Sequence, residues 1–138
     1  MIVDAQGRVL LVKHGYGELN WQIPGGLGEP GESAEETAHR EAREEAGVEL
    51  EALRLTGVYW EPDHPGSKGM HHFVFRATLA PASPAPSVAD KNEITDVGWF
   101  DPKSLPRPMS DFTEQRIADA LANGPAVFKT VGPRVWLK

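Results

Sequence analysis

Residues 26–48 read GLGEPGESAEETAHREAREEAGV, a glycine-rich loop followed by a run of good helix formers. Ser33 and Glu36 have the spacing of a capping box, in which each side chain binds the other residue's backbone N–H. Gly47 is the residue type that most often follows the last turn of a helix. Together these signals predict a helix over residues 33–46.

Three glutamates of this helix, Glu41, Glu44 and Glu45, form what we call the carboxylate triplet. Their spacing of i, i+3 and i+4 places them within one face of about 100°. Like charges so close repel one another, and Arg40, four residues from both Glu36 and Glu44, can neutralise only part of the charge. A divalent cation would neutralise the rest, and Mg²⁺ prefers oxygen ligands. A solvated acidic helix is the alternative interpretation.

The wider spacing resembles the Nudix box, G-x5-E-x7-R-E-U-x-E-E-x-G-U, where U is an aliphatic residue. Every fixed residue type of this motif is present. The matching positions are Gly26, Glu32, Arg40, the carboxylate triplet and Gly47, with Val48 as the final aliphatic residue. Ala42, at the other aliphatic position, is smaller than the usual Leu, Ile or Val. The preceding WQIPGG and a later Glu93-Ile94 before Trp99-Phe100 also resemble the family.

This resemblance implies an α/β fold, the Nudix-type α/β/α sandwich, with a mixed β-sheet between helices. It implies a single domain over residues 1–138. The implied activity is Mg²⁺-dependent hydrolysis of the pyrophosphate bond in a nucleoside diphosphate linked to another group X. Nucleoside triphosphates, nucleotide sugars, ADP-ribose and dinucleotides belong to this class.

The resemblance also assigns roles to individual residues. It makes the carboxylate triplet and the Gly26 carbonyl the ligands of Mg²⁺, with Mn²⁺ as a substitute. Arg40 would orient these carboxylates, Glu32 would brace the loop through Arg40, and Gly47 would end the helix. The general base is either a glutamate of the box, Glu41 or Glu44, or Glu93 from a later loop. A solvated turn residue is the alternative interpretation of Glu93.

Substrate-binding residues are harder to identify from the sequence. Aromatic residues in strands can stack on a base, although such residues more often belong to a core. The candidates are Trp21, Trp60 and Phe73, followed by Tyr59 and Phe75. The candidate phosphate contacts are Lys13, and then Arg8, Lys68 and Arg76, each of which has a surface charge as its alternative interpretation. His71 and His72 are neighbours in a predicted strand, so they point to opposite faces and cannot form a two-histidine site together.

The rest of the chain reads as short strands and one further helix. We predict a hairpin from residues 2–3 into 9–12, an extended segment over 21–24, and strands over 53–60, 71–79 and 97–100. The apolar spacing of residues 111–122 predicts a second helix. Residues 80–90 form a proline-rich loop and not a domain linker, because the chain beyond residue 90 is too short to fold alone.

Composition excludes several classes of function. The chain has no cysteine, which excludes disulfides, thiolate zinc sites and a cysteine nucleophile. A formal net charge of −6 disfavours a nucleic acid as the partner. No apolar run approaches the roughly 20 residues of a membrane helix. We therefore expect a cytoplasmic protein, monomeric or homodimeric, that acts on a small nucleotide and contacts neither nucleic acid nor membrane.

Three rival interpretations remain for residues 26–48. Gly26 to Gly31 matches the dinucleotide fingerprint G-x-G-x-x-G, but Glu29 and Glu32 crowd the helix entry where a pyrophosphate would bind. A Nudix-fold sensor that binds a nucleotide without hydrolysing it would have no need of the complete carboxylate triplet. An acidic helix that binds a protein partner would leave the glycines at Gly26 and Gly47 unexplained.

Overall fold

The computed structural model describes residues 1–138 and contains nine strands and two helices. In chain order they are β1 (Ile2–Val3), β2 (Val9–His14), β3 (Trp21–Gln22), α1 (Ala34–Ala46), β4 (Leu50–Glu61), β5 (Met70–Leu79), β6 (Ile94–Phe100), β7 (Met109–Ser110), α2 (Asp111–Leu121), β8 (Val127–Thr130) and β9 (Trp136–Leu137). Neither helix has the length and apolar character needed to cross a membrane.

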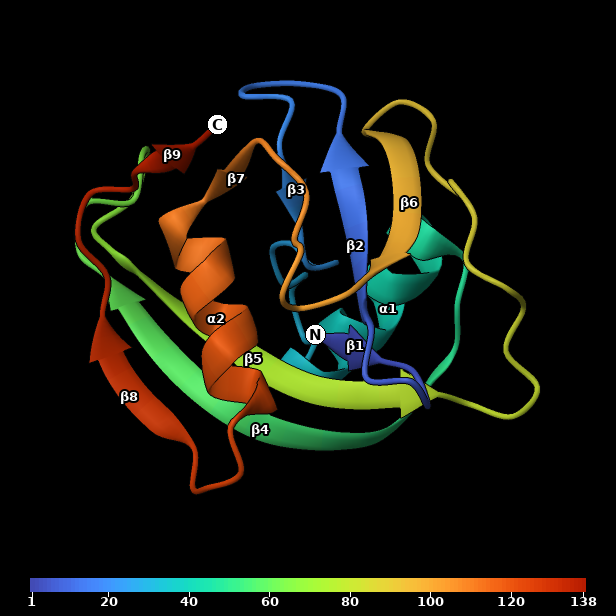
Figure 1. Ribbon diagram of the computed structural model, residues 1–138. Helices are drawn as coiled ribbons and strands as arrows, with labels where there is room; N and C mark the ends of the chain where they lie inside the picture. Colours follow the sequence, from blue (N-terminus) through green and yellow to red (C-terminus); the bar gives the residue numbers. More distant parts are fainter.

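All strands belong to one curled, mixed sheet (Figure 1). Its order is β8-β4-β5-β1-β2-β3-β7-β9, and β6 pairs with β2 outside this path. The long antiparallel hairpin β4–β5 forms one half, and the short strand β1 joins it to the other half. β1 is parallel to β5 at the single pair Ile2↔Ala77, so the edge of β5 before Phe75 is open on that side.

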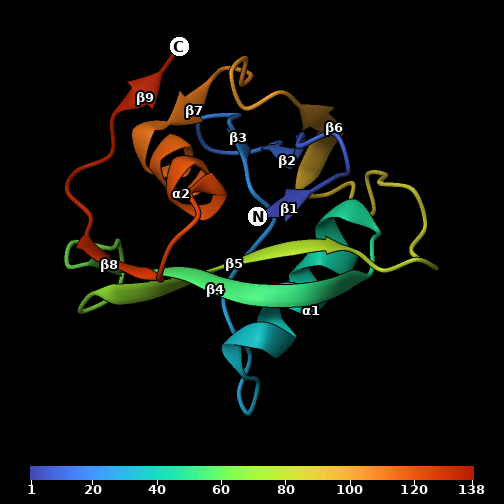
Figure 2. The same ribbon diagram turned by 60° about the horizontal axis from the view of Figure 1, so that its bottom comes forward.

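The two helices pack on opposite faces of this sheet, because alternate residues of a strand point to opposite sides. One core joins alternate residues of β1 and β2 to α1, and a second core joins the residues between them to α2. The first core contains Ile2, Leu10, Val12, Ala42, Ala46, Val48 and Ile94, and the second contains Val3, Val9, Leu11, Phe112 and Ile117 among others. In Figure 2, α2 and the beginning of α1 lie on opposite sides of the β4–β5 ribbon. The predicted α/β/α sandwich is confirmed.

The predicted elements agree with the structure except near the C-terminus. Both helices are present, with α1 from Ala34 to Ala46 and α2 from Asp111 to Leu121. Strands β4, β5 and β6 begin earlier than predicted, at Leu50, Met70 and Ile94. The sequence analysis did not predict β7, β8 and β9, which have only two to four residues each and therefore carry little periodic signal.

Candidate active site

Helix α1 begins and ends as its local sequence predicts. The Glu36 backbone N–H donates to Ser33 Oγ and the Ser33 N–H donates to Glu36 Oε2, both at 3.1 Å. Gly47 adopts the left-handed conformation with φ 66°, and its N–H donates to the last-turn carbonyls of the helix. Ala42 and Ala46 are buried against β1, β2 and β6. Packing of these alanines fixes the rotation of the helix and thereby the direction of the carboxylate triplet.

Arg40 connects the helix to the glycine-rich loop that precedes it. Its Nε donates to Glu32 Oε1 at 2.7 Å, and its Nη2 donates to Glu32 Oε2 at 3.1 Å and to the Leu27 carbonyl at 2.8 Å. The remaining nitrogen, Nη1, donates to Glu41 Oε1 at 2.9 Å and to Glu44 Oε2 at 3.0 Å. One guanidinium therefore holds the loop and orients two members of the carboxylate triplet.

The same contacts keep Glu32 ionised. Hydrogen bonds from Arg40, and then from the Glu29 backbone N–H, lower the pKa of Glu32 to about 2. The Thr37 hydroxyl also donates to Glu32 Oε2 at 2.8 Å. Glu32 therefore contacts the loop, Arg40 and the first turns of α1 at once.

Gly26 lies directly against the Glu41 carboxylate. A Cβ atom added at Gly26 would overlap Glu41 Oε1 and Cδ. Any larger residue would therefore displace the carboxylate from its place beside the loop backbone. The side chain of Glu41 is only 12% exposed, and burial raises its pKa, an effect that the Arg40 hydrogen bond partly offsets.

Glu45 is the most buried member of the carboxylate triplet, with 4% of the residue exposed. Its Oε2 accepts a hydrogen bond of 3.0 Å from the Gly25 N–H. Burial raises the pKa of Glu45 to about 8, and the charges of Glu41, Glu93 and Glu44 act in the same direction, against the opposing effect of the Gly25 hydrogen bond. The group carries a negative charge at neutral pH only at a free-energy cost.

Glu93 and Tyr16, which are distant from α1 in the sequence, also lie near the carboxylate triplet. Glu93 precedes β6, and its carbonyl accepts a 2.8 Å hydrogen bond from the Gly15 N–H. Its side-chain charge raises the pKa of both Glu41 and Glu45, and, after burial, that of the Tyr16 hydroxyl. Glu93 therefore lies beside the carboxylate triplet, and Tyr16 covers the same region.

His14, at the end of β2, borders the site from the other side. It is buried, its Nε2 lies 4.0 Å from Glu45 Oε1 and 2.6 Å from Gln22 Nε2, and burial lowers its pKa. The sequence analysis did not identify His14, Tyr16 or Gln22. Each is isolated in its segment, and only the β2–β3 pairing and the folded loop bring them to the carboxylates.

The donor set fits a hard divalent cation. Two of the three carboxylates, Glu41 and Glu45, have raised pKa values, and one guanidinium is the only side-chain cation that pairs closely with the triplet. A divalent cation with oxygen ligands relieves this repulsion without further rearrangement. The Gly26 backbone lies against Glu41, where its carbonyl could join such a ligand set.

A pocket of about 620 Å³ adjoins the site along the open edge of β5. Gly25 and Gly26, which contact Glu45 and Glu41, form part of its wall, whereas no member of the carboxylate triplet does. Phe73 and Phe75 line the pocket, and Phe73 is 53% exposed. The glycine-rich loop therefore separates the carboxylates from a cavity of the size that nucleotides occupy.

The other predicted substrate contacts lie elsewhere. Trp21 and Tyr59 belong to the core around α2, and Lys13 Nζ lies 6.0 Å from the centre of the Trp21 ring. Trp60 stacks on His71 at 4.6 Å and borders a smaller surface hollow. Arg8 pairs with Asp4, Lys68 is exposed, and Arg76 Nη1 donates to the Ala120 carbonyl at 3.4 Å.

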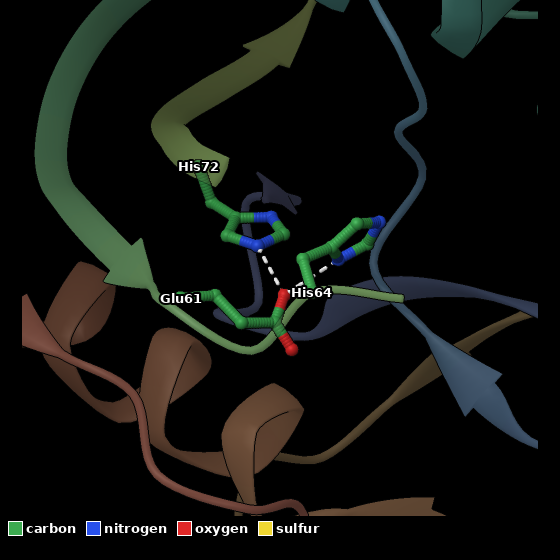
Figure 3. A group of neighbouring side chains, drawn as sticks. All are labelled: Glu61, His64 and His72. Atoms are coloured by element: carbon green, nitrogen blue, oxygen red, sulfur yellow. Dashed lines mark hydrogen bonds and ion pairs between the residues drawn. The ribbon is translucent and has the colours of Figure 1, made fainter. Parts of the chain in front are cut away.

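The far end of the pocket holds a polar cluster that the sequence analysis missed. His64 Nδ1 and His72 Nε2 both lie within hydrogen-bonding distance of Glu61 Oε2, at 2.9 and 2.8 Å (Figure 3). Arg134 Nη2 donates to the same oxygen at 2.9 Å. As predicted, His71 does not join His72, because the two neighbours point to opposite faces of β5. The cluster unites β4, β5, their connecting turn and the C-terminal segment, which no local pattern could indicate.

Comparison with known proteins agrees with this geometry. The family model of the NUDIX domain matches residues 1–121. A Bacillus subtilis protein named "Putative 8-oxo-dGTP diphosphatase" is 32% identical over 119 residues, which are 86% of this chain and 74% of that protein. A "MutT-like protein" of Streptomyces ambofaciens is 32% identical over 122 residues, 88% of this chain and 73% of that protein.

A solved structure supports the same conclusion. The MutT NUDIX hydrolase of Burkholderia pseudomallei superposes with a TM-score of 0.73 at 28% identity, covering 85% of this chain and 91% of that one. The family-model match over residues 1–121 includes both the glycine-rich loop and α1 with its carboxylate triplet. The chain belongs to the Nudix hydrolase family.

Proposed function

We propose that this protein is a Mg²⁺-dependent hydrolase that cleaves the pyrophosphate bond of a nucleoside diphosphate linked to a further group X, with Mn²⁺ as a substitute for Mg²⁺. The observation that carries the proposal is the convergence of Glu41, Glu44 and Glu45 with Arg40 beside Gly26. The names of the Bacillus subtilis relative, a putative diphosphatase, and of the Burkholderia pseudomallei hydrolase support the reaction class.

The carboxylate triplet, together with the Gly26 carbonyl, would hold the cation. The chemistry that a divalent cation supplies in such a site is neutralisation of phosphate charge and activation of water as a nucleophile. Arg40 keeps Glu41 and Glu44 in fixed positions, so that little reorganisation is needed when a substrate binds. We propose Glu93 as the base that accepts a proton from the attacking water, with Glu41 and Glu44 as the alternatives.

The pocket along β5 would receive part of the substrate. Its 620 Å³ and its wall of loop backbone next to Phe73 and Phe75 suit a nucleoside or a sugar. We propose Phe73, more than half exposed, as the stacking residue. Trp21, Trp60 and Lys13 remain weaker proposals, because Trp21 lies in the core and Trp60 lies outside this pocket. We also propose that residues 1–138 act as one domain, with a small nucleotide as partner and not a nucleic acid.

A panel of nucleotides tests this function. Nucleoside triphosphates, nucleotide sugars, ADP-ribose and dinucleotides are incubated with the protein and with either Mg²⁺ or EDTA, and the released products show which P–O bond breaks. Glu44→Gln and Glu45→Gln should lower turnover by more than the roughly 10–100-fold typical of residues outside the ligand set. Glu35→Gln, an exposed glutamate of the same helix, is the matched control and should remain active.

Two results would contradict the proposal. Near wild-type turnover of both Glu44→Gln and Glu45→Gln would show that the carboxylate triplet is not the site. Nucleotide binding without release of any product, across the whole panel and with either metal, would indicate a sensor instead of an enzyme.

A further inference from the structure

The end of the β5 pocket that lies away from the carboxylate triplet is lined by four nitrogen-bearing side chains. They are His64, His72, Arg116 and Arg134, and they face the same cavity as Phe73 and the glycine-rich loop. Glu61 is the one carboxylate that pairs with three of them, although it does not itself line the pocket. With two guanidinium groups against one carboxylate, this end of the pocket carries a net positive charge.

Glu61 makes all of its side-chain contacts through one oxygen. One oxygen, Oε2, is shared by His64, His72 and Arg134 at 2.8 to 2.9 Å. Burial by itself would raise the pKa of Glu61, but the hydrogen bonds of the two histidines and the charge of Arg134 lower it to about 2. Glu61 therefore remains ionised and positions these three side chains, and it does not contact Arg116.

Arg116 is a partly buried cation that forms no ion pair within the protein, although the charge of Glu61 acts on it from a longer distance. No carboxylate lies within ion-pair distance of it, and its Nε is buried without any hydrogen-bond partner. Its Nη2 donates to Thr113 Oγ1 at 3.0 Å, and its guanidinium lies 4.2 Å from the centre of the Phe112 ring. An unsatisfied buried donor on a charged group is costly, so its retention in a pocket wall points to a ligand.

The two guanidinium groups line the same pocket and share one aromatic neighbour. Both contact the Phe112 ring, with Arg134 at 5.4 Å from its centre. Burial, and then the charge of Arg134, lower the pKa of Arg116 to about 10. Two neighbouring cations of this kind are stabilised by a shared anion, and paired guanidinium groups match the oxygens of a phosphate better than a single ammonium does.

We propose that Arg116 and Arg134, with His64 and His72 beside them, bind a phosphate group of the substrate other than the pyrophosphate that is cleaved. This inference rests on the proposed function for the identity of the ligand as a nucleotide derivative. Its consequence is that group X, or the nucleoside, carries a second anionic group. The pocket then extends from the glycine-rich loop, which borders the carboxylate triplet, to an anion-binding end at Arg116.

A metal ion at Glu61, His64 and His72 is the competing interpretation, because two imidazoles and a carboxylate can hold a transition metal. The contacts disfavour it. Arg134 donates to Glu61 Oε2, the oxygen that both histidines contact, and Arg116 adds a second positive charge to that end of the pocket. A further cation there would be repelled, whereas an anion would be attracted.

Inorganic phosphate is the probe that tests the site, titrated in EDTA against the full chain and followed by the ¹⁵N-detected side-chain signals of arginine. Arg134→Gln should weaken phosphate binding by about tenfold or more, the effect expected for one charge-assisted hydrogen bond. Arg116→Gln should do the same. Arg107→Gln, which removes an exposed arginine paired with Glu114, is the matched control and should leave binding unchanged. Arg134 is partly exposed, so its variant keeps the test valid if Arg116→Gln does not fold.

Phosphate binding that is absent from the wild type, or that is equal in the wild type and in Arg134→Gln, would overturn the proposal. So would Zn²⁺ binding that is lost in His64→Gln and His72→Gln while phosphate has no effect. Because neither measurement involves hydrolysis or Mg²⁺, failure here leaves the proposed reaction untouched. Failure of the hydrolysis panel with intact phosphate binding would instead remove the proposed function, and with it the assignment of the phosphate to a substrate, but would leave the anion site itself.

Discussion

Glu45 is a carboxyl group placed where its charge is disfavoured. Its pKa rises from 4.5 to about 8 on folding, mainly through burial. A raised pKa in the folded state means that the folded protein binds more protons than the unfolded chain between these two values. The metal-free protein should therefore lose stability as pH rises from 4.5 to about 8. The Glu45→Gln variant should lose less stability than the wild type over the same pH range. Thermal unfolding in EDTA measures this difference.

Binding of Mg²⁺ should consequently release protons from this residue. A divalent cation favours the ionised carboxylate, so its affinity should increase with pH up to about 8. Calorimetric titration at pH 7 in two buffers with different ionisation enthalpies measures the number of protons released. Glu45→Gln should release fewer protons than the wild type, and equal values for the two proteins would place the ion elsewhere.

Gly26 offers a test of the Glu41 position that leaves every charge in place. In Gly26→Ala the added methyl group must displace the Glu41 carboxylate from its contact with the loop. Turnover should fall by about a hundredfold, a loss typical of a catalytic group misplaced by about 1 Å. The free energy of unfolding should change little, because the clash is with the movable end of a side chain.

The control for this variant is Gly124→Ala. Its added methyl group meets no atom within 4 Å, so both turnover and stability should stay near wild type. If Gly26→Ala were as active as Gly124→Ala, the close approach of loop and carboxylate would have no catalytic role.

At the scale of one element, α1 depends on its first hydrogen bonds. Ser33→Ala removes the side-chain acceptor of the Glu36 N–H and should lower the free energy of unfolding by about 1 kcal/mol. Urea unfolding measures the difference. Ser104→Ala, at an exposed serine whose hydroxyl makes no hydrogen bond, should be neutral. An equal loss in the two variants would mean that the cap contributes nothing specific.

Helix α1 was predictable because its signals are local. Ser33, Glu36 and Gly47 act on backbone groups within the same helix, and the spacing of the carboxylate triplet follows from helix geometry alone. The pairing of the strands was harder to predict from the sequence, because a register such as His14↔Ile94 depends on residues far apart in the chain. For the same reason the sequence indicated neither His14 beside Glu45 nor the cluster around Glu61. Burial raised the pKa of Glu45, and burial is a property of the completed fold.

At the scale of the whole molecule, the β2–β6 pairing carries Glu93 to the carboxylate triplet. The Gly15 N–H holds the Glu93 carbonyl at 2.8 Å, and the side chain is close enough to affect the pKa of Glu41 and Glu45. If Glu93 is the general base, Glu93→Gln should lower kcat by about 10²–10⁴-fold with KM and Mg²⁺ affinity nearly unchanged.

Rates measured across a Mg²⁺ titration separate the possible roles of Glu93. A requirement for more Mg²⁺ at half-maximal rate would identify a metal ligand instead of a base. If the rates of Glu93→Gln match those of the wild type at every Mg²⁺ concentration, Glu41 or Glu44 is the base instead. Glu51→Gln, at an exposed glutamate of β4, is the matched control and should behave as the wild type.

The last strands of the molecule have an evolutionary consequence. The family model matches residues 1–121, and β8, Arg134 and β9 follow that range and return to the sheet beside β4 and β7. The proposed catalytic loop and helix therefore lie within the matched range, whereas Arg134, one of the four proposed phosphate-binding residues, lies after it. A change at Arg134, which belongs to neither core, should therefore affect substrate preference more than the proposed cleavage chemistry. A family member could thus acquire a new substrate through substitutions after residue 121. Exchanging this C-terminal segment between relatives and measuring their substrate preference would test that consequence.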